Sequence, residues 1–126
     1  MWLAHPRTVM AADTVEGRRT LLVTGILDAR REGQPVTFEA EGVELEYDDR
    51  TIRLELDAEQ RDRLDALLST YHVFKIKQPE TRRAADGVVY LSAVTDAKHA
   101  ADFVDAAFRE VYELGGEYAL NAVDEA

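Results

Sequence analysis

The chain has 126 residues, an apolar content of 46% and a formal net charge of −10, from 25 acidic and 15 basic residues. These values are typical of one globular domain and exclude a disordered chain, while zero cysteines exclude disulfides, thiolate metal sites and thiol nucleophiles. No apolar run approaches the roughly 18 residues that a membrane span requires, and residues 1–12 lack the pattern of a signal peptide. We therefore expect a cytoplasmic protein with a single domain over residues 1–126, comprising an N-terminal extension (1–12) and a loosely held C-terminal tail (117–126).

The charge balance is the most informative feature of the composition. Only three basic residues are lysines, namely Lys75, Lys77 and Lys98. Many carboxylates with few lysines resemble the composition of proteins from salt-accumulating halophiles, because molar salt shortens the Debye length to about 3 Å and weakens repulsion between carboxylates. An acidic protein from an ordinary habitat is the alternative. In either case the charge disfavours nonspecific binding to nucleic acid or to an anionic membrane, so neither is an expected partner.

The first predicted element is a helix over residues 14–32. Asp13 with Glu16 resembles a capping box, and apolar residues follow at helical spacing up to Gly33. A strand over residues 20–28 is the competing prediction, because Thr24 and Gly25 are poor helix formers.

Three strands with period-two alternation follow, over residues 36–41, 43–48 and 51–56. Glu41-Gly42 and the segment 48–50 are short enough to close two hairpins. Alternation of this kind places one face of a sheet on a core and the other in water.

A second helix is predicted over residues 58–70, with Asp57 and Gln60 as its capping box. Its expected buried stripe is Leu64, Leu67, Leu68 and Tyr71. Two further strands are predicted over residues 72–77 and 88–94, separated by a polar connection at 78–87. The second of these strands is almost entirely apolar, which favours a central strand covered on both faces.

A last helix is predicted from Thr95 or Asp96 to the glycines at 115–116. Its expected inward face is Ala100, Phe103, Val104, Ala107, Phe108, Val111 and Leu114. The tail that follows alternates weakly and could form a short edge strand or a loose end.

The predicted order is α-β-β-β-α-β-β-α, a two-layer α+β sandwich with an antiparallel sheet of about five strands and helices on one face. This order is similar to that of the small secretion-chaperone fold, whose members are acidic dimers that hold extended partner chains. The similarity is one of architecture alone, without a shared residue motif.

Standard catalytic and nucleotide-binding motifs are missing from the sequence. Asp96, His99 and Asp102 have a spacing that could place ligands on one helix face, but a solvated helix is the preferred interpretation. We therefore expect no metal and no cofactor. Several carboxylates are expected on the open face of the sheet, where water rather than a catalytic cleft surrounds them: Glu39, Glu41, Glu44, Glu46 and Glu55.

A basic segment over residues 72–83 stands out from the acidic background. It contains Lys75, Lys77, Arg82 and Arg83 against one acid, Glu80, and begins at His72. These residues could bind a protein partner or a second copy of the chain, or could only balance acids on neighbouring strands. Our first hypothesis is a non-catalytic interaction domain that uses this segment, with self-association as one outcome. The alternative is a small-ligand-binding protein or enzyme that uses the same residues on an anionic ligand.

Overall fold

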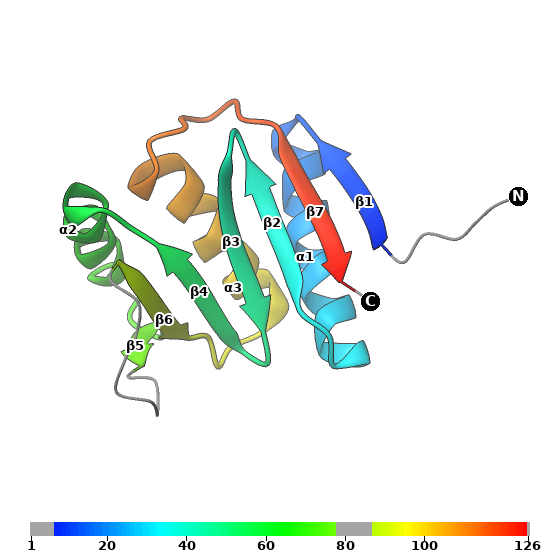
Figure 1. The fold of residues 1–126 in the computed structure, drawn as a ribbon, viewed down its shortest axis with the longest axis horizontal. Helices are drawn as coiled ribbons and strands as arrows, with labels where there is room; N and C mark the ends of the chain where they lie inside the picture. The colour runs from blue at the N-terminus through cyan, green and yellow to red at the C-terminus, as the bar shows by residue number, and fades with distance from the viewer. Residues whose placement is uncertain (1–6, 78–86, 126) are drawn as a thin grey trace, which may run out of the picture.

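The computed structural model describes residues 7–77 and 87–125, in which three α-helices are interspersed among seven strands (Figure 1). In chain order the elements are β1 (Arg7–Ala12), α1 (Val15–Glu32), β2 (Val36–Ala40), β3 (Val43–Asp48), β4 (Thr51–Glu55), α2 (Ala58–Leu68), β5 (Lys75–Lys77), β6 (Val88–Ser92), α3 (Ala97–Ala106), the π-helix η1 (Ala107–Val111) and β7 (Leu120–Glu125). None of these helices is long and apolar enough to cross a membrane.

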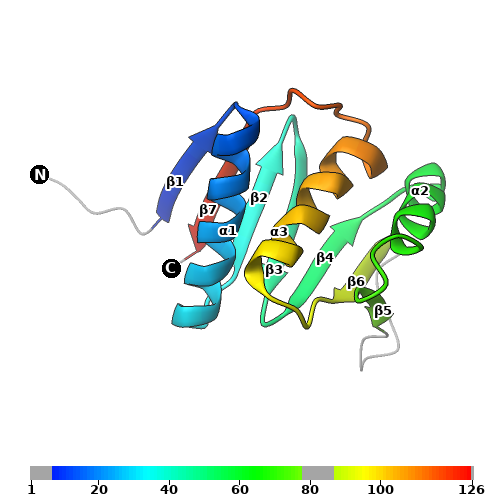
Figure 2. The ribbon, with the colours of Figure 1, turned by 180° about the vertical axis from the view of Figure 1, so that it is seen from behind.

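All seven strands belong to one antiparallel sheet with the order β1-β7-β2-β3-β4-β6-β5. The helices cover one face of this sheet, with α1 and α3 side by side across it (Figure 2) and α2 near the β4–β6 end. The predicted α+β class is therefore confirmed. The sheet has two more strands than predicted, and the order of elements departs from the secretion-chaperone order by a strand at each end.

The two additional strands come from the segments predicted as an N-terminal extension and as a loosely held C-terminal tail. Residues 7–12, within the expected extension, form β1, and most of the expected tail forms β7. β7 is inserted between β1 and β2, with Ala12 opposite Leu120 and Phe38 opposite Ala122. The tail is therefore neither loose nor at an edge. The apolar–polar alternation of β7 is weak because the strand contains alanine and asparagine. It is nevertheless an interior strand, and both of its partner strands are remote in sequence.

Helix α1 confirms the helix prediction over the strand alternative, although its N-cap differs. Thr14, not Asp13, caps the helix by accepting a hydrogen bond of 3.0 Å from the backbone N–H of Gly17. Gly25 is a poor helix former, but close packing requires a glycine at this position. An added Cβ would lie 3.0 Å from the ring of Phe38. Tertiary contact thus outweighs local propensity here.

The two predicted hairpins connect β2 to β3 and β3 to β4 through two-residue turns. The turn residues Glu41 and Gly42 have φ of 51° and 84°, and Asp49 and Arg50 have φ of 51° and 57°. Positive φ at both positions is the type I′ geometry that fits the twist of paired strands. Glu41 accordingly lies in a turn and not on the sheet face, where the sequence pattern had placed it.

The capping box of α2 is confirmed: Asp57 accepts from the backbone of Gln60 at 2.8 Å, and Gln60 accepts from the backbone of Asp57 at 2.9 Å. The predicted strands around it are shorter than expected. The first is reduced to β5, and β6 buries alternate residues on one face only, so it is not covered on both. The predicted connection at 78–87 lies, apart from Gly87, outside the described residues.

The core lies between the sheet and the helices. The predicted inward face of the last helix is confirmed, with Leu114 only half-buried, and Asp96 caps this helix by accepting from the backbone of His99. Phe103 and Phe108 are fully buried, whereas Leu68 only packs against the core from a half-buried position. In place of continuing as an α-helix, the chain widens into η1, a deviation that is common at functional sites.

Candidate functional site

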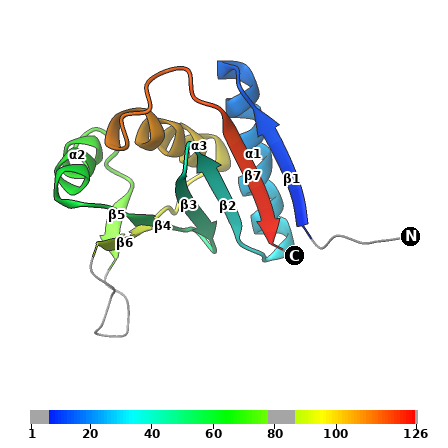
Figure 3. The same cartoon turned by 45° about the horizontal axis from the view of Figure 1, so that its top comes forward.

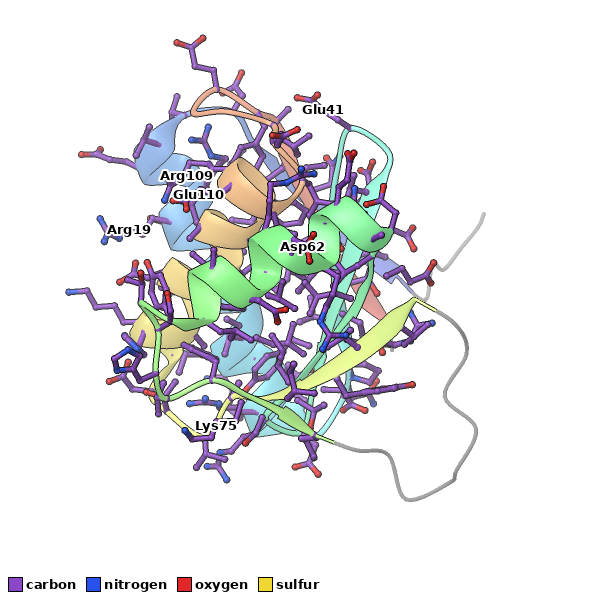
Figure 4. All side chains as sticks on the ribbon, turned by 90° about the vertical axis from the view of Figure 1, so that its left-hand side faces the viewer. Arg19, Glu41, Asp62, Lys75, Arg109 and Glu110 are labelled. Carbon is purple, nitrogen blue, oxygen red and sulfur yellow. The ribbon has the colours of Figure 1, made fainter. Side chains whose placement is uncertain are left out.

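The basic segment predicted from the sequence begins at one end of the sheet. There β5 pairs with β6 alone among the described strands, so its other edge is free. The register places Lys75 opposite Ser92 and Lys77 opposite Tyr90, on the face of the sheet away from the helices. Both lysines are exposed, and Lys75 lies at the surface in Figure 4.

Two exposed apolar side chains lie close to these lysines in the chain, and Ile76 projects on the opposite face of β5. Val73 is 41% exposed and Ile76 is 39% exposed, and both are among the large apolar residues that the described structure leaves in water. The preceding residue Phe74 is buried and stacks on Phe103 with ring centroids 4.3 Å apart. Phe74 therefore anchors the segment while its neighbours remain accessible. We call Val73, Lys75, Ile76 and Lys77 the β5 edge.

Of the three other predicted site residues, the structure describes only His72. The ring Nε2 of His72 contacts the carbonyl of Ser69, so His72 ends the α2 region and is not part of the β5 edge. Arg82 and Arg83 lie outside the described residues. Lys77 donates to the hydroxyl of Thr51 at 3.1 Å, a neutral group that does not balance its charge.

The candidate metal residues are each engaged in another role. Asp96 caps α3, and Asp102 accepts from Arg19 at 3.1 Å. The ring of His99 stacks on Phe74 at 5.4 Å. Within the described part of the chain no group of three potential ligands is arranged to hold a metal ion.

Two of the five carboxylates predicted on the open sheet face, Glu39 and Glu55, have defined partners. Glu39 accepts from Asn121 at 2.8 Å and from the backbone of Gly42 at 3.0 Å, and Glu55 pairs with Arg53 at 3.1 Å. Glu44 lies directly opposite Glu39 in the β2–β3 register. The arrangement is a charged, hydrated surface with one cross-strand pair of like charges.

A site that sequence reasoning missed lies over the junction of α1 and α3. A cavity of about 290 Å³ is lined by Val15, Arg19, Leu22, Tyr71, Ala101, Asp102, Asp105 and Arg109. Figure 4 shows Arg19 on α1 and Arg109 on η1 on the same side of the molecule. Arg109 donates to Asp105 at 2.9 Å, in parallel with the Arg19–Asp102 pair. Burial, with a further contribution from Asp102, raises the pKa of Tyr71.

Arg18, the only buried charged residue in the described structure, lies 3.9 Å from the carboxylate of Asp105, which lines this cavity. It donates to the carbonyls of Tyr118 at 2.9 Å and Gly116 at 2.8 Å, and its guanidinium lies 4.2 Å from the centre of the Tyr118 ring. Tyr118 in turn donates to Asp105 at 2.6 Å, and burial followed by this hydrogen bond raises the pKa of Tyr118. The network ties α1 and α3 to the segment that leads into β7.

Little in the sequence points to this network, because Arg18 and its carbonyl partners are about 100 residues apart. The spacing of Asp105 and Arg109, four residues apart on one helix, is the one local signal for part of it.

The chain belongs to a family of unknown function, DUF7975, whose model matches residues 7–125. This match includes β1 and β7 and therefore the entire sheet. No curated protein matches the chain. No solved structure matches it either.

Proposed function

We propose that this chain is a non-catalytic interaction domain that binds an extended, acidic segment of a partner protein along the β5 edge. The observation that carries the proposal is the coincidence of a free strand edge, two exposed lysines and two exposed apolar residues on a chain of net charge −10. A free edge offers backbone donors and acceptors to an added strand.

The charge pattern specifies the chemistry of this partner. Lys75 and Lys77 project on one face of β5 and Ile76 on the other, where it lies opposite the buried Leu91. An added strand is therefore best matched by acidic residues opposite the two lysines and an apolar residue between them. A second copy of β5 is a poor match, because an antiparallel pair centred on Ile76 places lysine opposite lysine.

The experiment uses a synthetic peptide of alternating glutamate and valine as the probe, titrated into the full chain at moderate and at molar KCl. We expect the double variant Lys75→Glu/Lys77→Glu to bind it about tenfold more weakly than the wild type, since each contact pair contributes roughly 0.5–1 kcal/mol. Arg82→Glu/Arg83→Glu tests the remainder of the basic segment in the same way.

Arg31→Glu/Lys98→Glu is the matched control, because it changes the net charge equally at two exposed residues of the helical layer. Equal weakening by the control and the β5 variant indicates a general charge effect and contradicts the proposal. Binding of a lysine–valine peptide as strong as that of the glutamate peptide also contradicts it.

We also propose that the acidic surface is an adaptation to a cytoplasm with molar salt. The cross-strand pair of Glu39 and Glu44 supports this, because directly opposed like charges destabilise a sheet in dilute buffer. At molar salt their repulsion extends only about 3 Å.

Raising KCl from the millimolar to the molar range is therefore expected to raise the melting temperature by about 5 °C or more, equivalent to roughly 1 kcal/mol for a domain of this size. Circular dichroism melts measure the change. Glu44→Gln should reduce the salt dependence by removing one opposed charge, whereas a melting temperature that is flat or falls with KCl contradicts the adaptation.

A further inference from the structure

The other edge of the sheet, formed by β1, differs from the β5 edge in length and charge. β1 has six residues and pairs with β7 alone among the described strands, and Figure 3 shows it at the opposite end of the sheet from β5. Its sequence, Arg-Thr-Val-Met-Ala-Ala, contains one charge, although 32% of the chain is charged. It is the longer and less charged of the two free edges.

Long, uncharged edge strands promote pairing with another chain, and proteins usually protect them with lysines, prolines or a short length. β5 has two lysines in three residues, which oppose pairing with a second copy of β5 although they suit an acidic strand. β1 has neither lysine nor proline. The absence of acidic residues also makes β1 a place where two chains of net charge −10 can approach without opposed carboxylates.

We infer that two copies of this chain pair antiparallel through β1 and form one continuous sheet. In the β1–β7 register, Met10 and Ala12 lie opposite Ala122 and Leu120, which are buried on the helix-covered face. A two-fold axis perpendicular to the sheet keeps both helical layers on the same side. Residues that lie opposite each other across this axis must therefore project on the same face of the sheet. At the axis itself, one residue of β1 lies directly opposite the same residue of the second copy.

Charge selects which residue lies on the axis. With Met10 on the axis, Val9 lies opposite the partner's Ala11, and Arg7 lies opposite the partner's Asp13. The exposed Asp13 directly follows β1, so this register places a positive residue opposite a negative one at each end of the ladder. With Val9 on the axis, Arg7 lies opposite the partner's uncharged Ala11, and the position opposite Asp13 falls outside the residues that the structure describes. The Met10 register is thus the one that the charges complement.

Pairing through β1 is separate from the proposed binding at the β5 edge. It leaves both β5 edges free at the two far ends of the combined sheet. Failure of one proposal therefore does not imply failure of the other, since the peptide titration and the dimer measurements use different variants.

Single cysteines test the geometry directly, because the natural chain has none. Residues directly opposite in an antiparallel pair have Cα atoms about 4.5–5.5 Å apart, within the range of about 4.4–6.8 Å that a disulfide spans. In the proposed register only Met10→Cys meets its own copy, whereas Val9→Cys is displaced from its copy beyond that range. We expect rapid disulfide dimers on mild oxidation for Met10→Cys and slow ones for Val9→Cys. Equal rates, or the reverse order, overturn the register.

Charge exchange tests the same register without a covalent link. Arg7→Asp and Asp13→Arg each create two opposed like-charge pairs, and each should raise the dimer dissociation constant about tenfold in light scattering or sedimentation. The double variant Arg7→Asp/Asp13→Arg restores opposite charges and should recover the wild-type constant. A wild-type chain that remains monomeric well above micromolar concentration overturns the inference, as does a double variant no better than the single ones.

Discussion

Phe108→Ala is expected to lower the free energy of unfolding by about 3–5 kcal/mol, one of the two largest effects we predict for a single side chain. Phe108 is fully buried in η1, and its ring lies 5.4 Å from the ring of Tyr118 and 6.3 Å from that of Tyr112. Truncation removes both aromatic contacts and leaves a cavity that the surrounding sheet and helices fill only in part. Urea denaturation in molar KCl measures the change.

Leu68→Ala is the matched comparison on the neighbouring helix. Leu68 is half-buried at the end of α2, so its truncation should cost about 1 kcal/mol, in proportion to the area it buries. The sequence pattern had placed Leu68 and Phe108 equally in the core. Equal losses from the two variants would support that pattern over the structure, and a loss below about 0.5 kcal/mol for Phe108 would place it at the surface.

The elements that sequence reasoning predicted correctly carry strong local signals. The β2–β4 strands alternate with period two, and α2 begins at the Asp57 and Gln60 capping box that the structure contains. Where the prediction failed, the determining contacts are remote. β1 and β7 acquire their strand structure by pairing with each other across more than 100 residues, which no local pattern encodes.

The candidate site residues also divide into those with a strong local signal in the sequence and those without one. Lys75 and Lys77 were found because a cluster of lysines is conspicuous in an acidic chain, and the structure adds that no second strand among the described residues pairs with the edge beside them. In the sequence, Val73 and Ile76 do not differ from ordinary residues of a predicted strand, because only the structure gives their exposed fractions. The network around Arg18 was missed because the sequence does not distinguish a buried arginine from a solvated one.

Arg18→Met is the second large effect that we expect, a loss of about 3–5 kcal/mol in the free energy of unfolding. The Arg18 guanidinium is the hydrogen-bond donor to the carbonyls of Gly116 and Tyr118, and it lies 3.9 Å from the carboxylate of Asp105. Hydrogen bonds from a charged group contribute about 1.5–3 kcal/mol each, and their loss leaves the buried carbonyl of Tyr118 without this donor. Methionine keeps an apolar side chain at this position but removes the guanidinium that lies 4.2 Å from the centre of the Tyr118 ring, so the loss reports on the hydrogen bonds and the cation–π contact together.

The position of the Arg18 network predicts which strands lose stability first in Arg18→Met. Gly116 and Tyr118 lie in the segment that leads from η1 into β7, and β7 holds β1 to the rest of the sheet. Hydrogen exchange in Arg18→Met should therefore accelerate first in β7 and β1, before β3 and β4.

Arg19→Met is the control, since Arg19 is the next residue along α1 and pairs with Asp102 on the surface. The side chains of Arg19 and Asp102 are 57% and 36% exposed, and ion pairs of this kind contribute about 0–1 kcal/mol. Buried ionic groups in some proteins can be replaced by apolar residues without loss of stability. If Arg18→Met proves as stable as Arg19→Met, with unchanged exchange in β7, the buried arginine does not hold the last strand in the sheet. A loss confined to Arg18→Met, with β7 and β1 exchanging first, assigns it that role.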